Sequence, residues 1–244
     1  MQSALATLRF LSRLPVPGNS QSDVDFIHAA WFPVVGLLIG AILASIDQAL
    51  RPLPWDLRNA LIVFVGVALT GALHLDALMD TADGLAAPSC KSLVVTRASV
   101  HTAEGTAAGV LALSLSWLAL YHLTDSVRAQ WLVCAPMLGR AAVVLGYRLL
   151  KTRADAGSVT RSLAMSASCN LSTATLIISL IVPLAMLGTS LSIPLALAVV
   201  ITALFAGACR LRLGQFAGDQ YGALAVVNEL SLLLGAGILR SPPG

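Results

Sequence analysis

Three aspartates at helical spacing are the residues of this chain best suited to chemistry. Asp76, Asp80 and Asp83 lie in the run H-L-D-A-L-M-D-T-A-D-G, which extends from His74 to Gly84. Each residue of an α-helix turns by about 100°, so these spacings place the three carboxylates within roughly 60° of one face. Like charges so close together need a cation to offset their repulsion. Mg²⁺ is the expected ion, because it takes oxygen ligands and commonly carries substrate phosphates.

The aspartates end one of several apolar segments. Of the 244 residues, 57% are hydrophobic and only 11% are charged, whereas a soluble domain has about 25% charged residues. A membrane span needs about 17–25 residues. Seven segments approach or reach that length: Trp31–Leu50, Leu57–Ala77, Thr106–His122, Trp131–Leu150, Leu171–Leu187, Leu191–Cys209 and Ala223–Leu239.

These segments occupy most of the chain. We therefore predict an all-α fold, a single polytopic membrane domain over residues 1–244 with six or seven transmembrane helices, since helices satisfy their own backbone in lipid. The first 17 residues carry Arg9 and Arg13 among leucines and predict a short amphipathic helix on the membrane surface. The net charge of +3 is too small to indicate the strongly basic surface that binds nucleic acid.

The distribution of basic residues predicts the orientation. With seven spans, ten of the 15 Lys and Arg residues fall on the side that carries Asp80 and Asp83, four fall on the other side, and Arg140 lies within a span. The ten are Arg9, Arg13, Lys91, Arg97, Arg148, Lys151, Arg153, Arg161, Arg210 and Arg212. Because Lys and Arg accumulate in cytoplasmic loops, we expect the aspartates to face the cytoplasm.

Further candidate residues lie later in the chain. Asp219 stands between Gly218 and Gly222 and is either another metal ligand or the N-cap of the last helix. Arg140 lies within an apolar segment and needs a partner there; a guanidinium also suits phosphate. Glu229 should face protein or a water-filled cavity rather than lipid.

Several motifs occur together in the order found in a known family. They are F-L-S-R-L-P-V-P at 10–17, W-F-P-V-V-G at 31–36, the triple-aspartate run, G-V-L-A-L at 109–113, A-P-M-L-G-R at 135–140, and G-D-x-x-G-A at 218–223 with Glu229. With these motifs the chain resembles the cobalamin synthase family, the adenosylcobinamide-GDP ribazoletransferases, over residues 10–229. The triple-aspartate run is the most specific of them.

The resemblance implies an activity and a set of site residues. The family is integral to the membrane and joins α-ribazole, or its 5′-phosphate, to adenosylcobinamide-GDP with release of GMP, using Mg²⁺. The resemblance implies a location in the bacterial inner membrane, with lipid around the protein. The sequence leaves open whether the protein forms a homo-oligomer. The implied catalytic and metal-binding residues are Asp76, Asp80, Asp83 and Asp219, and the implied phosphate-binding residues are Arg13, Arg140 and Arg153.

The chain departs from the family pattern before its third span. Where the family usually has M-K-D-S-R-x-G, this chain has V-H-T-A-E-G-T at 100–106. The usual Asp is Thr102 here and the usual Arg is Glu104. Glu104 or His101 is the candidate to replace the missing ligand.

Three other functions remain open from the sequence. Asp80-x-x-Asp83-Gly84-x-x-Ala87 matches half of the CDP-alcohol phosphotransferase signature, although Pro88 replaces its arginine. A cation-coupled transporter would use the acids as an ion relay, and it predicts acids in two repeated halves, of which the chain gives no clear sign. The last alternative is an accessory membrane scaffold, which the missing Asp and Arg would allow.

Overall fold

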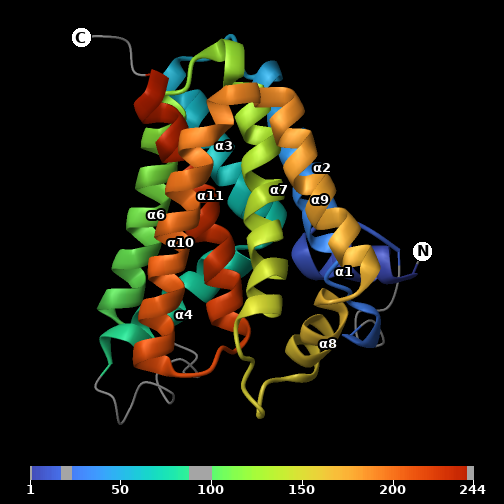
Figure 1. The fold of residues 1–244 in the computed structure, drawn as a ribbon. Helices are drawn as coiled ribbons and strands as arrows, with labels where there is room; N and C mark the ends of the chain where they lie inside the picture. Colours follow the sequence, from blue (N-terminus) through green and yellow to red (C-terminus); the bar gives the residue numbers. More distant parts are fainter. Residues whose placement is uncertain (1, 18–23, 88–100, 241–244) are drawn as a thin grey trace.

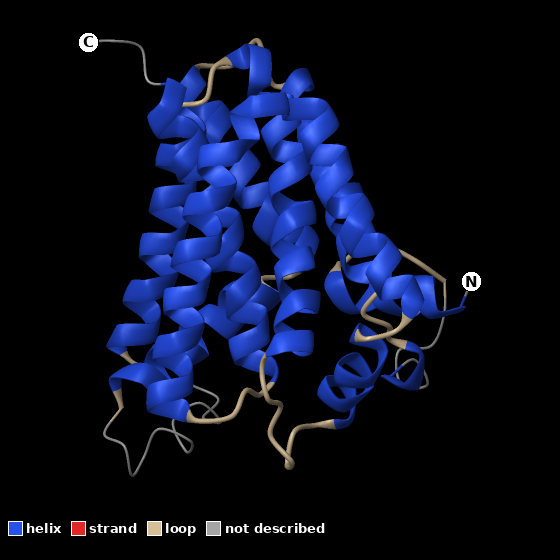
Figure 2. Cartoon of the chain, viewed as in Figure 1, coloured by secondary structure: helices blue, strands red, loops and turns tan. Residues whose placement is uncertain are grey.

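The fold of this chain is built from helices. A computed structural model describes residues 2–17, 24–87 and 101–240. Within them the only bridge of β type joins Thr152 to Phe216, and Figure 2 shows helices throughout. The helices are α1 (Gln2–Leu11), η1 (Val24–Phe26), α2 (Trp31–Ala49), α3 (Trp55–Thr70), α4 (Leu73–Ala86), α6 (Ala103–Tyr121), α7 (Asp125–Leu149), α8 (Ser158–Ala167), α9 (Asn170–Leu187), η2 (Gly188–Leu191), α10 (Ser192–Leu213) and α11 (Gly218–Arg240). The predicted all-α fold is confirmed.

The membrane-spanning elements agree with the predicted polytopic bundle. Among the described residues, five helices are long and apolar enough to cross a membrane, or six if the bent pair α3–α4 is one span. One of the five is the 44-residue run Asn170–Leu213. At about 1.5 Å per residue that run would be twice as long as the ~30 Å hydrocarbon core is thick. However, η2 interrupts it, and Figure 1 shows α9 and α10 descending separately from η2, so this run supplies two passes.

The predicted second span, Leu57–Ala77, is wrong as a single straight helix. The chain bends by 89° between α3 and α4. Gly71 and Ala72 both have a φ of 60°, and the Ala72 N–H donates to the Val67 carbonyl, which closes α3 as a Schellman turn. Left-handed backbone costs a non-glycine residue about 1–2 kcal/mol. Hydropathy did not reveal this bend, because Gly71 and Ala72 are themselves apolar.

The helix α7 is the centre of the bundle. In its spanning window 72% of the residues are buried, compared with 17% for the run Asn170–Leu213. On α2, Gly40 approaches α7 so closely that an added Cβ would lie 2.6 Å from the Leu132 carbonyl oxygen. Small residues at such spacing let helices in lipid pack backbone to backbone. The close approach of α2 to α7 therefore depends on the small size of Gly40.

A buried ion cluster joins three helices at the end of the bundle away from α4 (Figure 1). Asp47 of α2 accepts hydrogen bonds from Arg58 of α3 at 2.9 and 2.5 Å and from Arg128 of α7 at 2.8 Å. All three side chains are at most 1% exposed. Arg58 also pairs with the half-exposed Asp125 at 2.9 Å, and both guanidinium groups lie over the Trp55 ring.

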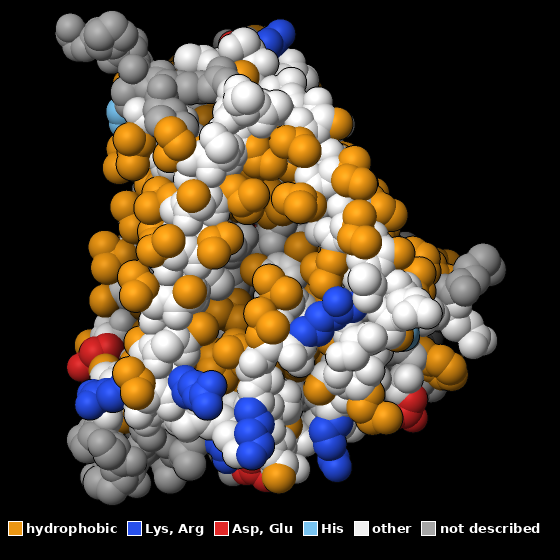
Figure 3. All heavy atoms as spheres, in the orientation of Figure 1, with side chains coloured by type: hydrophobic (Ala, Val, Ile, Leu, Met, Phe, Trp, Pro, Cys, Tyr) orange, Lys and Arg blue, Asp and Glu red, His pale blue; other side chains and the backbone are white. Residues whose placement is uncertain are grey.

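Two further predictions concern the N-terminal helix and the distribution of basic residues. The amphipathic segment near the N-terminus forms α1, whose Ala6, Thr7 and Leu11 are buried, and it packs beside α2. Its place on a membrane surface stays a prediction. Figure 3 shows Lys and Arg side chains gathered mainly toward one end of the visible face. Lys91 and Arg97, which entered the charge count, lie outside the described residues.

Candidate metal and phosphoryl-transfer site

The helix α4 carries all three predicted aspartates on one face. Along the helix their side chains become progressively less exposed, from 62% at Asp76 to 18% at Asp80 and 1% at Asp83. The same imidazole, that of His101, lies within 3.5 Å of all three carboxylates. The common face predicted from their spacing is therefore confirmed.

His101 closes this cluster from the chain just before α6. Its Nε2 lies 3.0 Å from an oxygen of Asp76, and its Nδ1 lies 3.3 Å from Asp80 and 3.5 Å from Asp83. Partial burial opposes protonation of His101, but the hydrogen bond to Asp76 and the charges of the three carboxylates raise its pKa above the usual value. A protonated His101 offsets part of the repulsion among the acids, and it would have to lose that proton to bind a metal ion.

Asp83 is held in place by the start of α6. Its carboxylate accepts hydrogen bonds from the Thr102 N–H at 3.0 Å, the Thr102 hydroxyl at 2.5 Å and the Gly105 N–H at 2.5 Å. The free N–H groups at a helix N-terminus favour an anion there. Thr102 therefore has a structural task, since it fixes the carboxylate that is most deeply buried.

Three groups meet closely enough to share one metal ion. Asp80, Asp83 and His101 form a three-residue group, in which one ligand atom from each residue lies within 4.8 Å of the others. Carboxylate oxygens and a neutral imidazole nitrogen are common ligands of divalent cations. The donor set therefore fits a divalent cation, and the described part of the chain offers this one group of at least three such residues.

Glu104 lies next to this group and contacts it through Thr102. Its carboxylate lies 2.7 Å from the Thr102 hydroxyl, whose single hydrogen can be donated either to Glu104 or to Asp83. Of the two candidates for the missing ligand, the structure thus brings His101 rather than Glu104 into the three-residue group. A direct role for Glu104 as a ligand stays a prediction.

Asp219 reaches the site from the first turn of α11. It lines a cavity of about 260 Å³ together with Asp76, His74 and Tyr147, and it interacts electrostatically with Asp76 and Asp80. The two helices can meet because both contact residues are small: a Cβ added to Gly222 would lie 2.6 Å from the Cβ of Ala77. Asp219 is therefore a neighbour of the three-residue group.

The three predicted phosphate-binding arginines lie in different places. Arg13 is exposed and lines a cavity of about 540 Å³ that also includes Asp76. Arg153 pairs with Asp155 at 2.6 Å, and its N–H donates to Phe216 in the loop before Asp219.

Arg140 lies inside the bundle rather than beside the carboxylate group. It is 4% exposed and pairs with Glu229 at 2.5 Å. This confirms the expectation that Arg140 has a partner within the protein and that Glu229 faces the protein interior. A phosphate role for Arg140 is untested and would require that buried ion pair to open.

Comparison with known proteins identifies the family. A family described as cobalamin-5-phosphate synthase matches residues 3–237. The chain belongs to this family. It is 33% identical over 233 residues to an adenosylcobinamide-GDP ribazoletransferase of Pseudomonas fluorescens, which covers 93% of this chain and 96% of the relative. A protein of the same name from Brevibacillus brevis is 29% identical over 243 residues, covering 96% and 97%.

The cobalamin-5-phosphate synthase assignment confirms the resemblance found in the sequence, and with it the class of enzyme, a transferase. A third relative, an adenosylcobinamide-GDP ribazoletransferase of Synechocystis, is 33% identical over 253 residues, covering 96% of this chain and 94% of the relative. No solved structure matches the chain. The alternatives of a CDP-alcohol phosphotransferase, a transporter and a scaffold receive no support from these comparisons.

Gly105 offers a test of the site in which none of the candidate ligand residues is replaced. A Cβ at Gly105 would lie 2.5 Å from both oxygens of Asp83, which cannot move without losing its hydrogen bonds. We therefore expect Gly105→Ala to lower the affinity for a divalent cation by about 10–100-fold, the usual cost of disturbing groups that orient a ligand. The affinity can be measured by calorimetric titration of the purified protein.

Gly109→Ala, one turn later on α6, is the matched control. Its Cβ would lie 2.8 Å from the sulfur of Met79, a flexible side chain that can move aside. We expect this variant to bind the cation as the unaltered protein does. Equal affinities in the two variants would show that the placement of Asp83 does not govern binding.

Proposed function

We propose that this chain transfers α-ribazole, or its 5′-phosphate, to adenosylcobinamide-GDP with release of GMP. Its relatives carry the name of that activity. The observation that carries the proposal is the meeting of Asp80, Asp83 and His101 within 4.8 Å, beside a cavity lined by Asp76 and Asp219. Such an arrangement suits the attack of a hydroxyl group on a negatively charged diphosphate.

The reaction replaces the phosphoanhydride bond to GMP with a phosphate ester bond to ribazole. The ribazole hydroxyl attacks the phosphorus on the cobinamide side, a new P–O bond forms, and the bond from that phosphorus to the oxygen of GMP breaks. The hydroxyl proton passes to a carboxylate. Asp76 and Asp219 are the candidates, because they line the adjoining cavity and lie outside the three-residue group.

Asp80, Asp83 and His101 would hold Mg²⁺ in this proposal, with Asp76 and Asp219 nearby. When bound, the cation supplies positive charge that neutralises the diphosphate. The chain itself contributes the fixed positions of the carboxylates: Thr102 and Gly105 hold Asp83, and His101 is hydrogen-bonded to Asp76. Phosphoryl transfer depends mainly on such positioning and on charge neutralisation.

Arg13 is the arginine best placed to bind a substrate phosphate. It is exposed and lines the same cavity as Asp76. Its N–H donates to the Leu69 carbonyl at 2.7 Å, so its backbone is fixed to the end of α3. Arg153 would first have to exchange Asp155 for the phosphate.

The proposed location is the bacterial inner membrane, with the site facing the cytoplasm. The multi-pass helices support a membrane protein. The excess of Lys and Arg on the side of the aspartates supports the orientation. Water-soluble diphosphate substrates would then reach the carboxylates from the cytoplasm.

A direct assay tests the proposal. The purified protein in lipid nanodiscs is given adenosylcobinamide-GDP, α-ribazole and Mg²⁺, and GMP and the corrinoid product are followed by chromatography. We expect both products to form in equal amounts, and to require both substrates and the cation. Failure to form either product, in folded protein that binds the cation, would overturn the proposal.

A further inference from the structure

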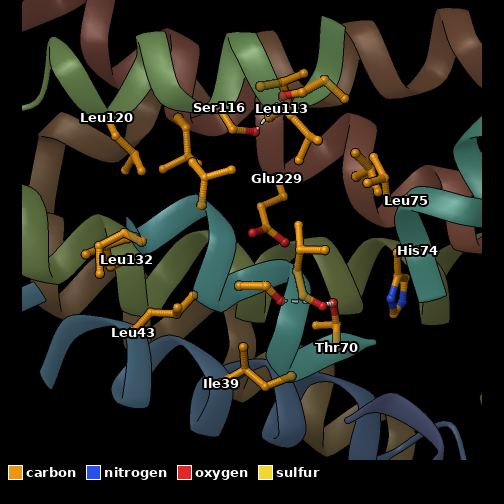
Figure 4. A pocket seen from close by; sticks show the side chains of 18 of the residues that line it. Ile39, Leu43, Thr70, His74, Leu75, Leu113, Ser116, Leu120, Leu132 and Glu229 are labelled. Atoms are coloured by element: carbon orange, nitrogen blue, oxygen red, sulfur yellow. Dashed lines mark hydrogen bonds between the residues drawn. The ribbon is translucent and has the colours of Figure 1, made fainter. Parts of the chain in front are cut away.

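An interior cavity lies beside the bend between α3 and α4. Its volume is about 130 Å³, close to the ~150 Å³ of an engineered apolar cavity that binds benzene. Apolar side chains form most of its wall, among them Ile39, Leu43, Ile62, Leu113 and Leu132. Figure 4 shows these walls coming from several helices, with the Glu229 carboxylate at the centre of the space.

The cavity also contains a few polar groups, two of which have unpartnered atoms. His74 is 6% exposed and Arg140 is 4% exposed, yet Nδ1 of His74 and Nε of Arg140 have no hydrogen-bond partner. Leaving a buried polar group unpaired costs about 1–3 kcal/mol. An occupant that could pair with these nitrogens would remove that cost.

The cavity and the one beside the carboxylates share a lining residue of α4. His74 lines both this cavity and the one that contains Asp76 and Asp219. Leu75, the residue before Asp76, lines it as well. A molecule held here could therefore place a second part of itself beside the carboxylates.

We propose that this interior cavity binds the flat, largely apolar base of the nucleoside substrate, with a ring nitrogen of the base paired to Arg140 or His74. The inference rests on the proposed function, because α-ribazole is the riboside of 5,6-dimethylbenzimidazole. That base is a two-ring system with two methyl groups and, once joined to ribose, one free ring nitrogen. The mostly apolar wall matches the rings and methyl groups, and Arg140 or His74 matches the one free ring nitrogen. The ribose would extend past His74 to the carboxylates.

A purine of similar size would bind poorly. Guanine and adenine carry several donors and acceptors, which the apolar walls would leave without partners. The cavity should therefore discriminate between the base of ribazole and the guanine of the other substrate. A lipid chain is the competing occupant, because Val63, Val67 and Leu113 also line a second cavity that includes the exposed Phe64.

Gly66 allows the cavity to be filled without a clash. It lines the cavity, and an added Cβ would meet nothing nearer than the Leu43 methyl groups at 3.9 and 4.0 Å. We expect Gly66→Leu to weaken binding of 5,6-dimethylbenzimidazole at least about tenfold, because the new side chain would overlap the ligand. Binding is measured by equilibrium dialysis in nanodiscs, with adenine as a second probe and Mg²⁺ titrated separately.

Gly207→Leu is the matched control, because a Cβ at Gly207 on α10 meets nothing within 4 Å. It should bind the base as the unaltered protein does, and both variants should bind Mg²⁺ normally. If Gly66→Leu does not fold, Ser116→Leu fills the same cavity from α6, since the Ser116 hydroxyl bonds only within its own helix, to Ala112.

Equal affinity for the base in the filled and control variants would overturn the inference, and so would adenine binding as tightly as 5,6-dimethylbenzimidazole. Displacement of the base by lipid chains but not by α-ribazole would also overturn it. These results are separable from the proposed function. A protein that releases GMP, but whose KM for α-ribazole does not change in Gly66→Leu, refutes only this inference; one that binds the base but releases no GMP refutes only the proposed function.

Discussion

Asp80→Asn will lower both the affinity for Mg²⁺ and the rate of product formation by about 100-fold or more. The amide would retain the shape of the side chain but lose the charge that a hard cation requires. Asp80 lies between the two other acids of α4 and is one of the three residues that meet within 4.8 Å. Removal of a direct ligand should cost at least as much as removal of a group that orients one, which is about 10–100-fold.

The stability of the variant separates this effect from misfolding. Asp80 contacts His101 at 3.3 Å and lies among carboxylates that repel it. Without a cation, we therefore expect Asp80→Asn to melt at the temperature of the unaltered protein or above it. With saturating Mg²⁺, the unaltered protein should be stabilised by its bound ligand and the variant should not.

Asp56→Asn is the control for Asp80→Asn. Asp56 is an exposed acid at the start of α3, at the other end of the bundle from α4. Its replacement should leave both Mg²⁺ affinity and turnover unchanged. Normal Mg²⁺ affinity in Asp80→Asn would remove the argument for a cation at these carboxylates.

The largest loss of stability should come from Asp47→Ala, far from the site. This change leaves the guanidinium groups of Arg58 and Arg128 buried without their shared counter-ion. Breaking a buried ion pair by removing one partner costs about 3–5 kcal/mol. The free energy of unfolding in mixed micelles, followed by circular dichroism, measures this effect.

Asp125→Ala is the matched control for the ion cluster. Asp125 also pairs with Arg58, at 2.9 Å, but its side chain is 48% exposed. Water can replace it, so we expect a loss of about 1 kcal/mol or less. If both changes cost the same, the buried cluster is not what joins α2, α3 and α7.

Local sequence patterns were sufficient for much of this protein. The all-α membrane fold follows from hydropathy, because each spanning helix satisfies its own backbone. The common face of Asp76, Asp80 and Asp83 follows from helical spacing. The family resemblance, which comparison confirmed, followed from the order of its motifs along the chain.

Contacts between distant segments could not be read from those patterns. The sequence offered Glu104, with His101 as the alternative, for the missing ligand, and the structure brings the His101 imidazole to within 3.5 Å of Asp83, 18 residues earlier in the chain. Arg58 is one of the four basic residues that the charge count placed on the side away from the aspartates, yet it is 1% exposed and paired with Asp47. Neither pair has a periodicity that would reveal it.

The sequence by itself determined that three carboxylates lie on one helix face at the end of an apolar segment, and it predicted a cation beside them. The tertiary structure decided which group completes the site and what surrounds it. The reason is physical: helix formation and hydropathy depend on neighbours within a few residues, whereas the bend at Gly71, the approach of His101 and the cavity beside α3 depend on how distant helices pack around one another.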